Sequence, residues 1–386
     1  MNTDISLTIE FIRHTYKTNA FIPLHAPQFD DRESKLVNET INSSFVSSIG
    51  KFVTQFEQDI QSYLSSNSAV AMVNGTAALQ SALYLAGVGV GDLVITQSLT
   101  FVATCNTIHH LGATPIFIDV SKEHLSLCPR ALENYLNQHA ELCDDGICRN
   151  KNSGQTIKAF VPMHTFGHPA ELDKLLVISQ QWNIPLIEDA AESLGSTYEG
   201  KHTGTFGRFA AISFNGNKII TTGGGGILIC HDQADAAYAH HINTTAKVAH
   251  PFEFYHDAYG FNNRLPNLNA ALGCAQMEKL DNYVKAKRRL ASQYQSFFAS
   301  SRFDFVTEPS NCRSNYWLNA ILLPDPALRE EFLVKTNEAN VMTRPVWQLM
   351  HSLPLFQHAE RDEQRNASWL AKRLINLPSS PVLKAD

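Results

Sequence analysis

The stretch SAVAMVNGTAALQSALYLAG, residues 68–87, gives the signals of a strand, a tight turn and a helix in immediate succession. Residues 68–73 are almost wholly apolar, which favours a buried strand. In the second half Leu79, Ala82 and Ala86 recur at helical spacing. A strand that leads through a turn into a helix is the repeating unit of α/β proteins. The stretch therefore predicts the first unit of an α/β fold.

Strand and helix signals continue to alternate as far as residue 230. Apolar strands are predicted at 93–97, 114–120, 158–165, 184–190, 210–215 and 226–230, and helices at 101–112 and 170–182. Near-continuous apolar strands separated by helices are typical of a mostly parallel sheet that is covered on both faces.

The pattern changes after residue 250, where we expect a smaller α+β domain. Its predicted elements are a long helix at 268–300, a strand at 315–323, a helix at 325–340, a short strand at 341–347 and a last helix at 366–377. The expected domains are thus 1–250, with the N-terminal segment, and 251–386. The sequence assigns no role to a polar insertion around 139–156.

Charge argues against some classes of partner. The chain has 386 residues, with 31 Lys and Arg against 37 Asp and Glu, a formal net charge of −6. This balance gives no electrostatic reason to expect a nucleic acid or an anionic membrane as partner. A phosphorylated small molecule remains possible, because backbone amides bind phosphate inside acidic proteins.

The N-terminal residues and the cysteines give further expectations. Residues 1–17 lack the basic, apolar and small-residue segments of a signal peptide, and no apolar run approaches the roughly 20 residues that span a bilayer. Seven scattered cysteines show no repeated spacing, and we interpret Cys143 and Cys148 as incidental loop thiols rather than metal ligands. We expect a cytoplasmic protein without a metal.

Polar residues stand at the ends of predicted strands, where open α/β sheets place ligands. Asn74-Gly75-Thr76 joins a strand to a helix and offers free amides to a phosphate, although it is also a good turn and cap. Asp189 protrudes from the end of an apolar strand, where it needs a cationic partner unless it caps a helix. Lys218, in a Gly/Asn turn after the next strand, is either a surface lysine or an amine in a pocket that forms a Schiff base.

The combination is more specific than its parts. A phosphate turn, an aromatic residue, a strand-end Asp, a Ser and a Lys, in this order, form the layout of a pyridoxal phosphate site. The chain resembles the DegT/StrS-type sugar aminotransferases over nearly its whole length. Its most specific segments are VNGTAAL (73–79), TFVATCN (100–106), GATPIFIDV (112–120), IEDAAESLGS (187–196), SFNGNKIITTGGGG (213–226) and YGFNNRLPNLNAALG (259–273).

The resemblance implies the aspartate-aminotransferase-like fold, fold type I of pyridoxal phosphate enzymes, and assigns roles to single residues. Lys218 matches the Schiff-base lysine and Asp189 the partner of the pyridine nitrogen. Phe101 matches the aromatic residue that stacks on the pyridine ring. Glu192 falls where the family often has Gln or His near the phenolic oxygen of the cofactor, so its role is less defined.

Further roles concern the phosphate and the substrate. Gly75, Thr76 and Ser213 match the phosphate ligands. Asn262 matches a residue that reaches the cofactor phosphate of the neighbouring subunit, which implies a homodimer with shared active sites; the alternative is that Asn262 only caps the helix that follows it. His164 is a candidate substrate contact, with a hydrogen-bonded structural histidine as the alternative.

The implied activity is transfer of an amino group from L-glutamate to a nucleotide-linked 4-keto-6-deoxy (N-acetylamino) sugar in bacterial surface-sugar biosynthesis, with pyridoxal 5'-phosphate as cofactor. UDP and GDP both remain possible as the nucleotide. Three segments look most like those of the legionaminic-acid-type enzymes: FVSSIGKFV (45–53), NKIITTGGGG (217–226) and VMTRPVWQLMHSLP (341–354). The alternatives are a pyridoxal-phosphate-dependent sugar dehydratase, against which Lys218 argues because related dehydratases have His there, and a non-catalytic cofactor-binding regulator.

Overall fold

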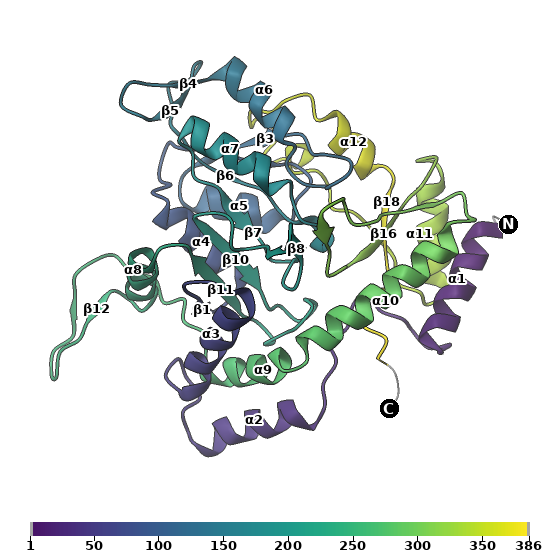
Figure 1. Ribbon diagram of the computed structural model, residues 1–386, viewed down its shortest axis with the longest axis horizontal. Helices are drawn as coiled ribbons and strands as arrows, with labels where there is room; N and C mark the ends of the chain where they lie inside the picture. The colour runs from purple at the N-terminus through teal and green to yellow at the C-terminus, as the bar shows by residue number, and fades with distance from the viewer. Residues whose placement is uncertain (1–2, 384–386) are drawn as a thin grey trace.

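A computed structural model describes residues 3–383. Its large sheet consists of two hydrogen-bonded groups of strands (Figure 1). The first group has the order β1 (Val70–Met72), β11 (Gly226–Cys230), β10 (Phe209–Ser213) and β7 (Ile187–Asp189). The second has the order β3 (Thr114–Ile118), β2 (Leu93–Gln97) and β6 (Ile157–Val161).

Parallel bridges join the two groups into one sheet, from Phe160 to Leu186 and from Met163 to Asp189. The strand order is therefore β1-β11-β10-β7-β6-β2-β3. Strand β11 runs antiparallel to both of its neighbours, while the pairs β7–β10, β2–β3 and β2–β6 are parallel. The prediction of a mostly parallel sheet is confirmed.

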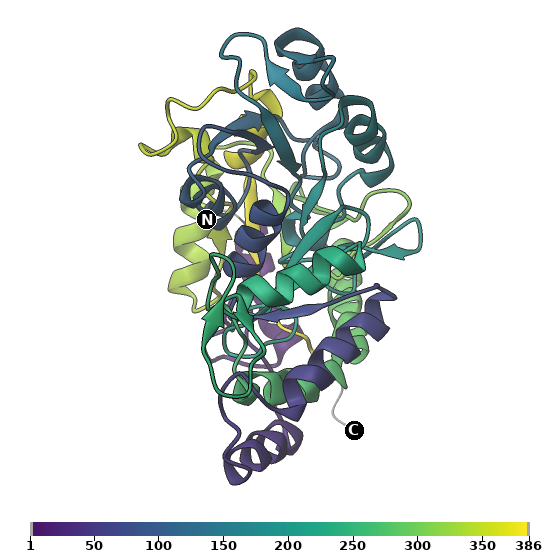
Figure 2. The same cartoon turned by 90° about the vertical axis from the view of Figure 1, so that its left-hand side faces the viewer.

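Helices cover both faces of this sheet, as the predicted pattern of buried strands requires. One face packs against α4 and α8, and the other against α3 and α9 at one end and α6 and α7 at the other. Figure 2 shows α2 and α6 at opposite ends of the molecule with the large sheet between them. The bounds are α2 (Asp31–Asn42), α3 (Lys51–Leu64), α4 (Gly75–Leu85), α5 (Val102–His110), α6 (Pro129–His139), α7 (Leu172–Trp182), α8 (Gln233–Asn243) and α9 (Asn267–Met277).

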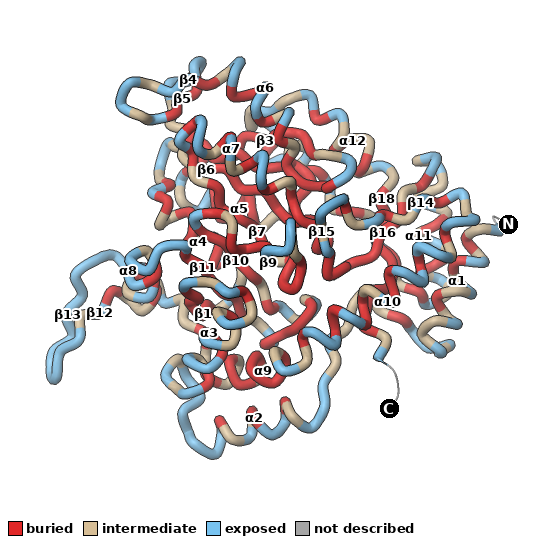
Figure 3. The backbone as a smooth tube through the Cα atoms, viewed as in Figure 1, coloured by how far each residue is buried: buried red, intermediate tan, exposed pale blue. Residues whose placement is uncertain are grey.

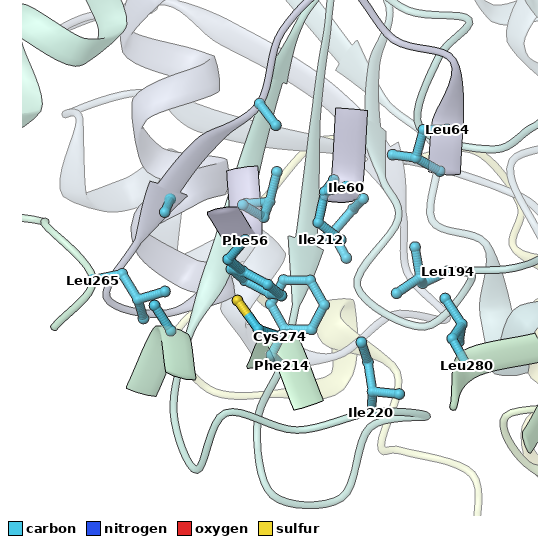
Figure 4. Close-up of a cluster of buried hydrophobic side chains, with 14 of the residues drawn as sticks. Phe56, Ile60, Leu64, Leu194, Ile212, Phe214, Ile220, Leu265, Cys274 and Leu280 are labelled. Atoms are coloured by element: carbon cyan, nitrogen blue, oxygen red, sulfur yellow. The ribbon is translucent and has the colours of Figure 1, made fainter. Parts of the chain in front are cut away.

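The core between α3, α9 and the sheet centres on a pair of aromatic rings (Figure 4). Phe56 and Phe214 are both fully buried, and their ring centroids lie 5.0 Å apart in an edge-to-face arrangement. A Cβ atom on Gly273 would lie 2.7 Å from Phe56 Cε2, so α9 needs glycine there to approach α3. Helices α2 and α3 are thus part of the large core.

A smaller antiparallel sheet lies in the C-terminal half, as expected. Its order is β14 (Asp304–Phe305), β16 (Asn319–Leu322), β18 (Leu374–Leu377) and β17 (Arg344–Pro345). It packs with α1 (Thr3–Tyr16), α10 (Leu280–Phe298), α11 (Leu328–Glu338) and α12 (Arg365–Ala371).

Two C-terminal predictions are wrong in detail. The last helix, expected over 366–377, ends at Ala371, and Leu374–Leu377 form a strand between β16 and β17. All four strand residues are buried, and the sheet satisfies their backbone groups. The long helix expected over 268–300 is two helices, α9 and α10, which are separated after Met277.

The packing crosses the domain boundary expected at residue 250. Helix α1 contributes Ile5 and Ile12 to the cluster that also contains Phe332 and Ile375 of the C-terminal half. Helix α9, beyond residue 250, packs in the core of the large sheet. The N-terminal helix therefore belongs with the small sheet, and the start of the C-terminal half belongs with the large one.

Two hairpins extend from this body. The insertion forms β4 (Ala140–Leu142) and β5 (Cys148–Asn150). A two-stranded arm, β12 (Lys247–Val248) and β13 (Tyr255–His256), projects beyond α8 and is mostly exposed (Figure 3).

A separate three-stranded sheet joins β8 (Thr197–Tyr198), β9 (Lys201–His202) and β15 (Cys312–Arg313). Within residues 3–383 no helix is both long and apolar enough to cross a membrane.

We expect Phe56→Ala to lower the free energy of unfolding by about 3–5 kcal/mol, because the change removes a fully buried ring and leaves a cavity against Phe214. Denaturant unfolding of the purified protein measures this. Val177→Ala removes an exposed apolar side chain from α7 and should change the free energy by less than about 0.5 kcal/mol. Equal effects of the two changes would contradict this account of the core.

Candidate active site

A cavity of about 360 Å³ lies where the large sheet meets the C-terminal half. It brings together predicted site residues that are far apart in the sequence. Seven of these residues line the cavity: Gly75, Thr76, Phe101, Asp189, Glu192, Ser213 and Lys218. Its other lining residues include Asn74, Met163, Asn215, Asn217, Trp317 and Trp347. His164 and Asn262 do not line it.

The start of α4 forms one wall. Asn74 caps the helix, its Oδ1 accepting a hydrogen bond of 2.7 Å from the amide of Ala77. Residues 74–76 can both cap the helix and bind an anion. The amides of Gly75 and Thr76 are in the first turn and have no acceptor within the helix. A Cβ atom on Gly75 would lie 2.7 Å from Ser213 Cβ, so glycine keeps this corner open. Amides, two hydroxyls and the positive end of a helix suit a phosphate group.

The carboxylate of Asp189 lies at the end of β7 and is buried. Its Oδ2 accepts 2.7 Å from Thr104 Oγ1, and its Oδ1 accepts 3.2 Å from the amide of Ala191. Burial raises the pKa of Asp189, and these hydrogen bonds only partly oppose it. Residues 190–196 form turns rather than a helix, so Asp189 does not cap one. A cationic N–H in the cavity would stabilise its charged form.

The adjacent Glu188 is held entirely by the protein. It accepts hydrogen bonds of 2.7, 2.7 and 2.8 Å from the amides of Gly204, Phe206 and Gly207, and 3.0 Å from His164 Nε2. Burial acts to raise the pKa of Glu188, but His164 and the amides outweigh it and hold this pKa below the ordinary value. The ionised carboxylate therefore fixes the loop at 204–207 to the end of β7.

His164 is placed differently from what the sequence suggested. It is fully buried, its Nδ1 accepts 3.0 Å from the amide of Ala170, and its Nε2 therefore donates to Glu188. With both ring nitrogens engaged it has none to offer a substrate. The geometry corrects the substrate contact that we predicted for His164 and favours the structural alternative.

Lys218 lies in the turn after β10 and points into the cavity rather than to the surface. Its Nζ is 3.3 Å from Glu192 Oε1 and 3.9 Å from the ring centroid of Trp317, and its side chain is 13% exposed. Glu192 Oε2 accepts 2.9 Å from the amide of Phe166. Burial raises the pKa of Glu192 to about 7, although Lys218 opposes this.

Asn262 is exposed, near the base of the arm formed by β12 and β13. Its Oδ1 accepts from the guanidinium of Arg264, at 3.0 and 3.2 Å. Helix α9 has Pro266 as its N-cap, without a side-chain capping bond. Asn262 therefore does not cap this helix, and it lies outside the cavity of its own chain.

Trp317 and Trp347 were not predicted as site residues. Trp317 Nε1 donates 2.7 Å to the carbonyl of Asn217, next to Lys218. Trp347 lies in the segment 341–354, and its ring centroid is 6.3 Å from that of Phe101. Large aromatic residues beside short strands were the available signal, but such residues are more often part of a core.

Comparisons with known proteins agree with this geometry. The model of the DegT/DnrJ/EryC1/StrS aminotransferase family matches residues 27–386. EpsN of Bacillus subtilis (strain 168), named as a candidate pyridoxal phosphate-dependent aminotransferase, is 35% identical over 372 residues, 95% of this chain and 92% of EpsN. The GDP-perosamine synthase of Escherichia coli O157:H7 is 33% identical over 366 residues, 95% of each chain.

Among solved structures, the aminotransferase TlmJ of Streptoalloteichus hindustanus superposes with a TM-score of 0.84 at 24% identity, over 93% of this chain and 94% of TlmJ. This likeness concerns the fold. It confirms the predicted aminotransferase-type α/β architecture.

We expect Glu188→Gln to lower the free energy of unfolding by about 3 kcal/mol, because an amide NH₂ would face groups that all donate. Since the pKa of Glu188 is lowered by folding, its stabilisation is present above the ordinary value of 4.5 and is lost as the pH falls through the folded value. The difference from wild type should therefore shrink in acid. Denaturant unfolding at several pH values tests this, with the exposed Glu141→Gln as control; a difference that does not depend on pH would contradict it.

Proposed function

Because this chain belongs to the DegT/DnrJ/EryC1/StrS family and is a pyridoxal-phosphate-dependent aminotransferase, we propose that it transfers the amino group of L-glutamate to a nucleotide-linked keto sugar. The observation that carries the proposal is that seven residues assigned from sequence converge on one cavity. The 33% identity to a GDP-perosamine synthase over 95% of each chain supports a nucleotide sugar as acceptor.

The cavity suits the cofactor. When bound, pyridoxal phosphate supplies an aldehyde and an electron-withdrawing ring. We propose that the amides of Gly75 and Thr76 with Ser213 hold its phosphate, and that Phe101 packs on its ring. Asp189 is a buried carboxylate that needs a cationic partner, and the protonated ring nitrogen is such a partner.

Lys218 and Glu192 also line the cavity and contact each other. In the proposed roles, Lys218 bonds to the cofactor and, once released, moves the proton between the carbon atoms that react. Glu192, which lines the same cavity, would face the phenolic oxygen of the cofactor in these roles. The ring of Trp317 covers the amine of Lys218, with its centroid 3.9 Å from Nζ. The lysine favours amino transfer over the dehydratase alternative.

The acceptor that we propose is a 4-keto-6-deoxy (N-acetylamino) sugar linked to UDP or GDP, used in bacterial surface-sugar biosynthesis. A narrower proposal is a sugar of the legionaminic-acid type, which rests on the likeness of three segments. Trp347 in one of them lines the cavity, where it would contact the acceptor.

The arm supports a homodimer with shared sites. Three aromatic side chains on or beside the arm are highly exposed: Phe252 (90%), Phe254 (83%) and Tyr259 (96%). Exposed aromatic clusters of this kind mark protein interfaces. Because Asn262 lies at the base of the arm and outside its own cavity, we propose that it reaches the cofactor phosphate of a second copy across a twofold axis.

The purified protein with pyridoxal phosphate should convert L-glutamate to 2-oxoglutarate only when a nucleotide-linked keto sugar is supplied in a multiple-turnover assay. Mass spectrometry of the product from a panel of UDP- and GDP-linked keto sugars identifies the acceptor. Lys218→Ala should reduce turnover by at least about a thousandfold, and borohydride should attach the cofactor to the peptide that contains Lys218. Attachment to another lysine, or dehydration without amino transfer, would refute the assignment.

Shared sites can be tested by complementation. Lys218→Ala and Asn262→Ala should each be impaired, but a mixed dimer would hold one site with both changes and one with neither. Activity should therefore rise above that of either variant after the two are mixed and allowed to exchange subunits. Lack of recovery, with subunit exchange shown by mass spectrometry of tagged chains, would mean that Asn262 acts within its own chain or not at all.

A further inference from the structure

Glu192 is a carboxylate in direct contact with the amine of the site. Its side chain is 2% exposed, and its Oε1 lies 3.3 Å from Lys218 Nζ. Its Oε2 is held by the amide of Phe166 at 2.9 Å. One oxygen is thus fixed by the backbone, and the other is directed at the lysine.

The surroundings of this pair offer few other charges. Asp189 is a second buried carboxylate near Glu192 and opposes its ionisation. His25, a partly buried residue near Lys218, has two buried ring nitrogens without a hydrogen-bond partner among residues 3–383. Burial, with Lys287 and Lys218 nearby, lowers the pKa of His25 well below its ordinary value, so this imidazole is a poor proton acceptor at neutral pH. Lys287 itself is fully buried and bonded to two backbone carbonyls, of Trp317 and Ser379.

A lysine must lose a proton before its nitrogen can attack a carbonyl carbon, and in water this happens only near pH 10.4. A carboxylate at hydrogen-bond distance gives that proton a destination inside the site. Of the carboxylates that line the cavity, Glu192 and Asp189, only Glu192 bonds to Lys218; Asp189 Oδ2 accepts from Thr104.

We propose that Glu192 is the proton acceptor of Lys218. The N–H bond of the ammonium breaks as an O–H bond forms at Glu192 Oε1, which leaves a neutral amine and a neutral carboxyl group. The proton returns to nitrogen when the amine is next released. No other reactant is needed, and the charge of the pair is the same before and after the transfer.

The acidity of Glu192 suits this exchange. Burial, with the nearby Asp189, raises the pKa of Glu192 to about 7, so its carboxylate holds a proton far more readily than an exposed glutamate would. Near neutral pH the carboxylate is present to accept, and its neutral form is not costly. A glutamine here would keep the shape but could not take the proton.

The test measures how fast the full-length, cofactor-free protein captures pyridoxal phosphate, followed by visible absorbance in a stopped-flow instrument from about pH 6 to about pH 10. In the wild type the rate should rise to about pH 7 and then level off, because Glu192 is ionised above that value. In Glu192→Gln the rate should be at least about tenfold lower at pH 7 and should keep rising into the alkaline range, where water removes the proton.

His25→Gln is the matched control, since it changes the other titratable group near Lys218. Its profile should resemble that of the wild type. Loss of the pH 7 break in His25→Gln would overturn the proposal, and so would an equal loss of rate at every pH in Glu192→Gln. If Glu192→Gln does not fold, the wild-type profile decides alone: a rate that rises steadily to pH 10 would also overturn it. The inference rests on the proposed cofactor site but not on the proposed sugar, because the capture assay contains no sugar. Failure of this inference can therefore be distinguished from failure of the sugar assignment, which only the amino-transfer assay tests.

Discussion

The burial of two adjacent carboxylates at the end of β7 constrains everything around them, because a buried charge without a partner is strongly destabilising. Successive residues of a strand point to opposite faces. The protein satisfies Glu188 completely, with three amides and His164, and in doing so fixes the loop at 204–207. Asp189 receives only Thr104 and one amide and lines the cavity. The structure thus satisfies the hydrogen bonds of one carboxylate internally and presents the other to a ligand.

Much of this site could be predicted, because strand ends of a parallel sheet meet at one edge and their polar residues then lie together. This reasoning placed Asp189 and Lys218 in one cavity. It failed for His164, which also ends a strand but bonds to Glu188 instead. No local pattern reveals which way such a side chain turns. Trp317 and Trp347 were missed because they reach the cavity from loops beside β16 and β17 of the smaller sheet.

The two wrong predictions of secondary structure, at 268–300 and 366–377, also arise because contacts with distant segments decide the local structure. The run LINL at 374–377, with three apolar residues and Asn376, is short enough to fit a helix or a strand, and only its pairing with β16 and β17 decides. The break between α9 and α10 coincides with ion pairs to α2, in which Glu278 meets Arg32 and Lys279 meets Glu33. Such contacts join segments almost 250 residues apart.

The packing of α1 against the C-terminal half has a consequence for synthesis. Ile5 and Ile12 share a core with Phe332 and Ile375, and Tyr16 donates to the carbonyl of Ser380. Helix α1 therefore leaves the ribosome long before these partners and cannot bury its apolar face against them until they have been synthesised. Domains fold as units during translation, and contacts of long sequence separation form late. The large sheet can assemble around residues 68–230 while α1 is still unpartnered, so chaperones would meet this helix as an exposed amphipathic segment on a half-finished protein.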